Sequence, residues 1–221
     1  VVRAHAMDKI EMLARILQAD GRGPTIVFCR TKRTAQKTSD DLFERGFRAA
    51  TIHGDLGQSA REKALNDFKA GKSDVLIATD VAARGIDIDG ITHVINYQCP
   101  EDEKTYVHRI GRTARAGAAG IAVTFVDWDE LARWKMIDTA LVLGLPEPVE
   151  TYSSSEHLFE MLNIPAGSSG RMNKKSATPV DRPKSDRPKT DRPKSEKAVE
   201  PKKPAADRIK RERTRTKRIS E

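Results

Sequence analysis

Short apolar segments alternate with longer amphipathic segments along the first 143 residues of the chain. Each apolar segment holds four to six mostly aliphatic residues, which is typical of a strand buried on both faces. The amphipathic segments carry apolar residues at helical spacing, which is typical of helices that cover a sheet. The alternation predicts an α/β fold built on a parallel sheet with helices on both faces. The predicted strands are residues 25–28, 49–52, 74–78, 93–97 and 121–126, and the predicted helices begin at Asp8, Thr31, Ser59 and Asp129.

The loops that follow four of these strands are rich in small, polar and charged residues. In a parallel sheet the functional residues lie on loops beyond the carboxyl ends of the strands. We therefore expect the functional site at loops 29–32, 53–58, 79–87 and 98–102.

Loop 53–58 and the helix after it favour a phosphate ligand. Gly54 and Gly57 precede a predicted helix N-terminus, where free backbone amides bind anions. Arg61 lies in the first turn of that helix, where the helix dipole disfavours a cation unless an anion is close.

The segment 78–87 is suited to close approach by a nucleotide. It continues from Thr79 and Asp80 through small residues to Arg84 and Asp87. Small residues let a ligand approach the backbone, and an acidic residue such as Asp87 can accept hydrogen bonds from ribose hydroxyls. Capping of short turns by the two aspartates is the alternative interpretation.

Four basic or titratable side chains are crowded into eight residues: His108, Arg109, Arg112 and Arg115. A helical or near-helical turn would place the first and the last two on one face. No Asp or Glu lies between residues 104 and 125 to pair with them locally, and the arginine fork suits phosphate oxygens. These residues predict an anion site. A surface helix with arginine–carboxylate bridges is the alternative.

Several kinds of site are absent from the sequence. No phosphate-binding loop of the Gly-x-x-x-x-Gly-Lys-Ser/Thr type occurs, and the two cysteines and five histidines lack metal-ligand spacing. We expect no metal site. Two cysteines, no apolar run of about 18 residues and no leader pattern at Val1 predict a cytoplasmic protein without membrane contact, and the missing initiator Met suggests an excised piece.

Composition changes near residue 165. Residues 166–221 carry 19 Lys and Arg against 8 Asp and Glu, with no aromatic residue, whereas residues 1–165 have a net charge of −3. Three tandem repeats, 181–185, 186–190 and 191–195, place a proline every fifth residue, which blocks helix formation. We expect a folded domain over 1–165 and a disordered basic tail over 166–221, joined at a Gly/Ser hinge. The tail is either a sequence-independent nucleic-acid arm or a solubilising segment.

Four ordered segments resemble the second-lobe motifs of DEAD-box ATP-dependent RNA helicases. They are Ile26-Val-Phe-Cys-Arg-Thr31, His53-Gly-Asp-Leu-Gly-Gln-Ser-Ala-Arg61, Ala78-Thr-Asp-Val-Ala-Ala-Arg-Gly-Ile-Asp87 and His108-Arg-Ile-Gly-Arg-Thr-Ala-Arg115. The resemblance covers residues 1 to about 145, leaving 146–165 as an extension, and residues 134–155 with the tail resemble the RhlE-type bacterial branch. It implies a RecA-like lobe that closes on a first lobe absent from this chain.

The resemblance also implies roles for individual residues. Arg112 and Arg115 would be arginine fingers on the γ-phosphate of ATP, and Asp87 would contact the ATP ribose. His108 and Arg109 would organise the contact with the first lobe, which would hold Mg²⁺. Ala114 departs from the family, which usually has glycine there, and this would loosen the placement of Arg115 if the turn needs positive φ. The residues implied to hold the RNA backbone are Thr31, Gly54, Arg61, Thr79 and Arg84.

The sequence therefore predicts the C-terminal lobe of an RNA helicase, inactive as an ATPase by itself. Its expected partners are RNA bound without sequence selectivity, the first lobe, and ribosomal or RNA-decay machinery. A non-catalytic RNA-binding or annealing module that acts through the basic tail is the alternative. A Rossmann-type nucleotide enzyme is disfavoured because no Gly-rich turn follows residues 25–28.

Overall fold

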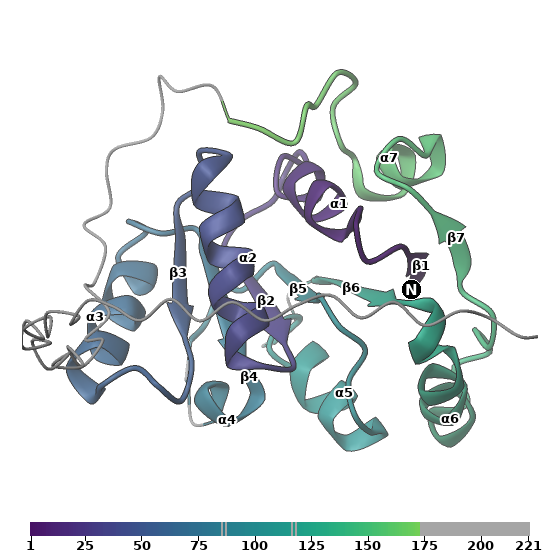
Figure 1. Cartoon of the computed structure of the whole chain (residues 1–221), viewed down its shortest axis with the longest axis horizontal. Helices are drawn as coiled ribbons and strands as arrows, with labels where there is room; N and C mark the ends of the chain where they lie inside the picture. The colour runs from purple at the N-terminus through teal and green to yellow at the C-terminus, as the bar shows by residue number, and fades with distance from the viewer. Residues whose placement is uncertain (85, 87, 116, 118, 173–221) are drawn as a thin grey trace, which may run out of the picture. The chain divides into compact units, whose positions relative to one another are not determined.

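The computed structural model describes residues 1–84, 86, 88–115, 117 and 119–172. Seven parallel strands form one sheet in the order β3-β4-β2-β5-β6-β1-β7 (Figure 1). The predicted parallel α/β fold is confirmed. The strands are β1 (Val2–Ala4), β2 (Thr25–Cys29), β3 (Ala49–Ile52), β4 (Val75–Thr79), β5 (His93–Asn96), β6 (Ile121–Val126) and β7 (Val149–Thr151).

The five predicted strands are present, and the structure adds β1 and β7 at one end of the sheet. Each of the two has only three residues, which is too short to show a pattern in the sequence. Asp8 does not cap the first helix through its side chain; it accepts a hydrogen bond from Ser153 N at 2.5 Å instead. The helices are α1 (Lys9–Ile16), α2 (Lys32–Glu44), α3 (Gln58–Lys69), α4 (Asp80–Ala83), α5 (Glu103–Ile110), α6 (Leu131–Leu141) and α7 (Glu156–Leu162), with a 3₁₀ turn, η1 (Trp128–Glu130).

Alternation along the strands divides the core into two layers. In β2, Val27 and Cys29 pack in a cluster with residues of α1, α2 and α7, whereas Ile26 and Phe28 pack with residues of α3 and α4 on the other face. Both faces of the sheet are therefore covered by helices, as Figure 1 shows. Burial also raises the pKa of the Cys29 thiol to about 12, as expected for a core cysteine rather than a reactive one.

The chain stays packed against this domain beyond the predicted boundary at residue 165. The Gly170 carbonyl accepts a hydrogen bond from Arg45 at 3.1 Å, and Met172 N donates to the Arg45 carbonyl at 2.8 Å. Arg45 also pairs with Glu11 of α1. Residues 165–172 thus lie along the amino edge of the sheet rather than forming a free hinge. The remainder of the predicted tail, residues 173–221, lies outside the described residues.

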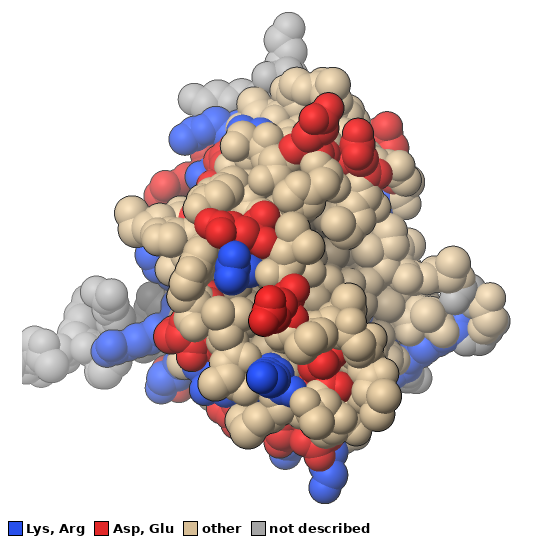
Figure 2. Space-filling view, turned by 90° about the vertical axis from the view of Figure 1, so that its right-hand side faces the viewer, with Lys and Arg blue, Asp and Glu red and all other residues tan. Residues whose placement is uncertain are grey.

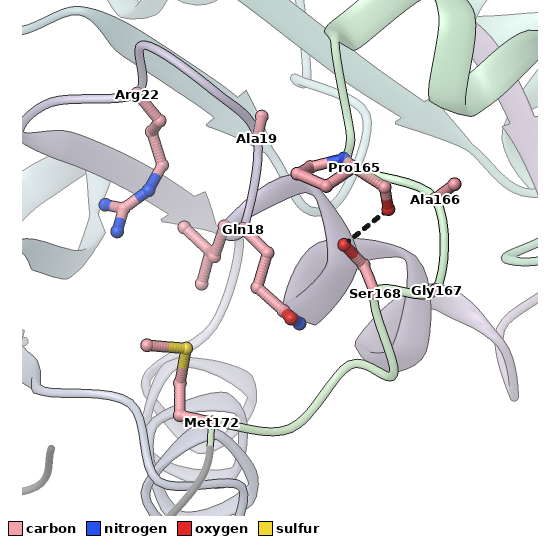
Figure 3. A pocket seen from close by; sticks show the side chains of 9 residues that line it. Gln18, Ala19, Arg22, Pro165, Ala166, Gly167, Ser168 and Met172 are labelled. Carbon is pink, nitrogen blue, oxygen red and sulfur yellow. Dashed lines mark hydrogen bonds between the residues drawn. The ribbon is translucent and has the colours of Figure 1, made fainter.

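A shallow pocket of about 500 Å³ opens between residues 165–172 and the loop after α1. Figure 3 shows Pro165 and Ser168 on one side, joined by a 2.8 Å hydrogen bond, and Gln18 and Arg22 on the other. The loop after α1 leads into β2, so the pocket lies at the amino edge of the sheet. It is separate from the predicted site.

Candidate functional site

The loops predicted to carry function begin at one edge of the sheet. Ala78 of β4 is in register with Phe28 of β2 and with Ile52 of β3, so the three strands reach their carboxyl ends together. The loops that follow therefore lie side by side. They carry Thr31, Gly54 and Thr79, three of the residues assigned to the RNA backbone.

These residues differ in how much of their surface is free. Thr31 is exposed and caps α2, where its side chain accepts a hydrogen bond from Thr34 N at 3.1 Å. Thr79 is only 8% exposed, whereas Gly54 and Arg84 are exposed and Arg61 is half-buried.

Side-chain contacts hold the loop after β3 against α2. His53 is buried, and its Nε2 lies 3.4 Å from Gln36 Oε1 while its Nδ1 accepts a hydrogen bond from Asp55 N at 3.3 Å. Burial lowers the pKa of His53, which keeps the imidazole neutral and able to accept that bond. An exposed bridge of 2.8 Å joins Asp55 to Lys32, and this cation lowers the pKa of Asp55.

Arg109 belongs to the arginine segment (residues 108–115), but its side chain faces the interior of the domain. Its side chain is 1% exposed, and Nε and Nη2 donate to the two Asp80 carboxylate oxygens at 2.7 Å each. Nη1 donates to Asn96 Oδ1 at 3.3 Å and to the Gln98 carbonyl at 3.0 Å, and the guanidinium lies over the Phe28 ring. Arg109 is therefore buried within this lobe and ordered by Asp80, and its role in organising the contact with the first lobe stays a prediction. The carboxylate that pairs with Arg109, Asp80, lies 29 residues away in the sequence, so a search for nearby acidic residues could not find it.

The helix ends before the two predicted arginine fingers. α5 stops at Ile110, and Arg112 continues in a tighter turn in which its amide donates to the Arg109 carbonyl at 3.1 Å. Ala114 then adopts φ +55° and breaks the helical path, so the expected helical face ends with Arg112. Positive φ at Ala114 is the conformation in which the sequence departure from glycine matters.

Arg112 and Arg115 are both partly exposed. Arg112 Nη1 donates to the Ile86 carbonyl at 2.9 Å, and Arg115 Nε donates to the Gly111 carbonyl at 3.1 Å. Asp87, the predicted ribose ligand, lies outside the described residues, but Ile86 directly precedes it in the sequence. His108 is exposed on α5.

A buried carboxylate beside these loops was missed from the sequence. Glu130 is 4% exposed and pairs with Arg30, which follows β2, and with Lys9 Nζ of α1 at 3.4 Å. These two partners are separated from it by 100 and 121 residues. Glu130 also closes a local capping box with Asp127 and lies 3.8 Å from Arg133, so the Asp-x-x-Glu spacing is the sequence signal that could have indicated it.

Acidic side chains gather at the far end of the sheet. Residues 136–170 contain Asp138 and four glutamates but no Lys or Arg. Figure 2 shows the face on the right of Figure 1, where β7, α6 and α7 lie, with several acidic patches on it. A polyanion is disfavoured at this end, in contrast to the β3–β4–β2 end that carries the predicted RNA residues.

Two kinds of feature are absent from the described part of the chain. No group of three or more His, Cys, Asp and Glu side chains within it could hold a metal ion. None of its helices is both long and apolar enough to span a lipid bilayer.

The sequence is similar to known helicases. A family model described as the helicase conserved C-terminal domain matches residues 8–117. The ATP-dependent RNA helicase CshA of Listeria monocytogenes is 50% identical over 137 residues, which are 62% of this chain and 26% of that protein. A DEAD-box CshA of Geobacillus kaustophilus is 46% identical over 137 residues, 62% of this chain and 29% of that protein. The chain spans less than a third of the length of these relatives.

Solved structures of DEAD-box proteins share the fold. E. coli SrmB bound to regulator of ribonuclease activity A matches with a TM-score of 0.63 and 33% identity, over 71% of this chain and 90% of that one. S. cerevisiae Dbp5 bound to RNA and ADP BeF3 matches with a TM-score of 0.63 and 33% identity, over 74% and 42%. The RhlE-type branch stays a prediction. The order of motifs, the RecA-like sheet and these matches together show that the chain belongs to the DEAD-box RNA helicases and contains their C-terminal helicase domain.

Proposed function

We propose that this chain is the lobe of an ATP-dependent RNA helicase that supplies Arg112 and Arg115 to ATP held by a first lobe. The observation that carries the proposal is the placement of Arg112. Its guanidinium is held by the Ile86 carbonyl, in the loop that continues to Asp87, and it remains partly exposed at the carboxyl edge. A positioned arginine that reaches ATP only on lobe closure would stabilise the charge of phosphoryl transfer.

The RNA backbone would run along the loops after β2, β3 and β4, next to the arginines. Two exposed positions there, Gly54 and Arg84, leave room for phosphates, and the acidic end of the sheet lies beyond β5 and β6. Binding through phosphates alone would give little sequence selectivity. As the resemblance to the family implies, Mg²⁺ would be held by the first lobe together with the phosphates of ATP.

The test is RNA-stimulated ATP hydrolysis by the chain alone and after addition of a separately made DEAD-box first lobe. We expect no turnover alone and measurable turnover with the added lobe. Arg112→Ala should lower that turnover about 10³-fold while RNA binding is retained. Arg48→Ala removes the same charge at the amino edge of the sheet and should leave turnover unchanged. Unchanged turnover in Arg112→Ala would remove its role as a finger, and turnover by the chain alone would refute the two-lobe division.

An RNA-binding module that acts through the tail is the second candidate function. Residues 208–218 carry seven Lys and Arg against one Glu, and the described chain ends at Met172 on the amino edge, away from the motif loops. Removal of residues 173–221 should weaken RNA binding and flatten its salt dependence. If the salt dependence of RNA binding does not change, the tail acts only as a solubilising segment.

A further inference from the structure

Glu130 joins the carboxyl ends of three neighbouring strands. Its carboxylate accepts hydrogen bonds from Cys99 N, after β5, at 3.4 Å and from Asp127 N, after β6, at 3.1 Å. It also pairs with Arg30, after β2, and with Lys9 of α1. Because β2, β5 and β6 are adjacent in the sheet, one buried side chain holds three neighbouring loops.

Arg30 extends this contact to the predicted RNA side. The residue after it is Thr31, which caps α2 and is a predicted RNA ligand. Arg30 N donates to Gln98 Oε1 at 3.0 Å, so the loop after β2 is bound both to the carboxylate of Glu130 and to the loop after β5.

Gln98 extends the contact to the arginine segment. Its backbone carbonyl accepts a hydrogen bond from Arg109 at 3.0 Å, and Arg109 lies three residues before Arg112. Two hydrogen bonds of 3.0 Å therefore connect Arg30, the residue before Thr31, through Gln98 to Arg109, in the segment that carries the predicted arginine fingers.

The chemistry of Glu130 makes these contacts interdependent. The carboxylate of Glu130 is 4% exposed and is satisfied by two backbone amides and three cations, Lys9, Arg30 and, at 3.8 Å, Arg133. It cannot release one loop without losing part of the pairing of a buried charge. Displacement of the loop after β2 by RNA would thus change the free energy of the loop after β5, and the reverse. None of the quoted helicase motifs includes Glu130.

We propose that Glu130 is a positioning residue that couples RNA binding at the loop after β2 to the placement of the arginine segment. The proposal rests on the proposed function. It predicts that neutralising this carboxylate weakens the coupling, so that a higher RNA concentration is needed to stimulate ATP hydrolysis.

The test compares Glu130→Gln with Asp129→Asn in the chain combined with its first lobe. Asp129 is the neighbouring exposed carboxylate, so both variants remove one negative charge from the same turn. In Glu130→Gln the RNA concentration for half-maximal ATPase stimulation should rise about 5-fold or more, with a smaller change in the KM for ATP. Amide hydrogen exchange at Arg30 and Cys99 should quicken in the 221-residue chain itself, and Asp129→Asn should change neither.

A folded Glu130→Gln variant with an unchanged RNA requirement overturns the proposal, even if its thermal stability falls. If that variant does not fold, Arg30→Gln breaks the same link from a side chain that is 26% exposed, and an unchanged RNA requirement there has the same meaning. Absence of RNA-stimulated hydrolysis in the unsubstituted protein would instead overturn the proposed function together with this inference.

Discussion

Two regions carry family motifs at the same edge of the sheet, the loops after β2 and β3 and the arginine segment 108–115 at the end of α5, but their side chains differ in burial. In the first region Thr31 and Gly54 are exposed, Thr31 makes a local capping contact, and the bridge between Lys32 and Asp55 lies on the surface. In the second, Arg109 is buried and saturated by a carboxylate, an amide and a carbonyl. One motif therefore contains both a buried structural residue, Arg109, and a partly exposed arginine, Arg112. Membership of a motif does not by itself define a residue's role.

Loss of the buried Arg109 side chain should have the largest effect on stability. Arg109→Met leaves the Asp80 carboxylate and Asn96 without their cationic partner, and loss of one member of a buried pair costs about 3–5 kcal/mol. Urea unfolding of the chain measures this. His108→Gln, an exposed change on the same helix, should stay within about 0.5 kcal/mol. Similar losses of unfolding free energy in the two variants would contradict the distinction between a buried structural Arg109 and an exposed His108.

Glycines in the two regions should respond unequally to an added methyl group. A Cβ at Gly120 would clash with Thr113 Oγ1 and lie 2.7 Å from Ala114 N, whereas a Cβ at Gly54 meets nothing within 4 Å. Gly120→Ala should lower the free energy of unfolding by about 1–3 kcal/mol, and Gly54→Ala should leave it nearly unchanged. If RNA phosphates approach the backbone at Gly54, that second variant should still weaken RNA binding. The measurements are urea unfolding and RNA titration.

Ala114 should give a gain rather than a loss. At φ +55° a glycine avoids the steric penalty of a side chain, so Ala114→Gly should raise the free energy of unfolding by up to about 1 kcal/mol. Ala119→Gly provides the control in the same loop, because Ala119 does not have positive φ and should show no gain. A loss in Ala114→Gly equal to that in the control would show that the turn is not strained.

The smallest expected effect is on pH dependence. Burial lowers the pKa of His53, in the motif loop, and of His93, in the sheet, below their ordinary value of 6.5. The unfolded chain then binds more protons, so the stabilisation is complete above pH 6.5 and decreases as the pH falls toward 5. Urea unfolding at pH 7.5 and 5.5 measures the decrease, and His53→Gln combined with His93→Gln should reduce it. If the double variant loses as much stability between pH 7.5 and 5.5 as the unsubstituted chain, other titratable groups cause the decrease.

The sequence by itself determined five strands, the helices α1, α2, α3 and α6, the parallel fold and the edge at which the motif residues gather. These features follow from local periodicity, from breakers such as glycine and from the geometry of parallel strands. It did not reveal β1 and β7, whose three residues form no recognisable pattern and gain stability only by pairing in the sheet.

Only the tertiary structure decided which charged residues face inward. Arg109 pairs with Asp80, 29 residues away, and Arg30 pairs with Glu130, 100 residues away. In each pair the two residues follow strands that are separated by one strand in the sheet, and the carboxyl ends of these parallel strands meet at one edge. A buried charge must be paired, so folding selects its partner by position in space rather than by spacing in the chain. The segment 165–172 shows the same limit. Its Gly/Ser composition indicated a hinge, but Arg45, itself paired with Glu11, holds Gly170 and Met172 against the domain.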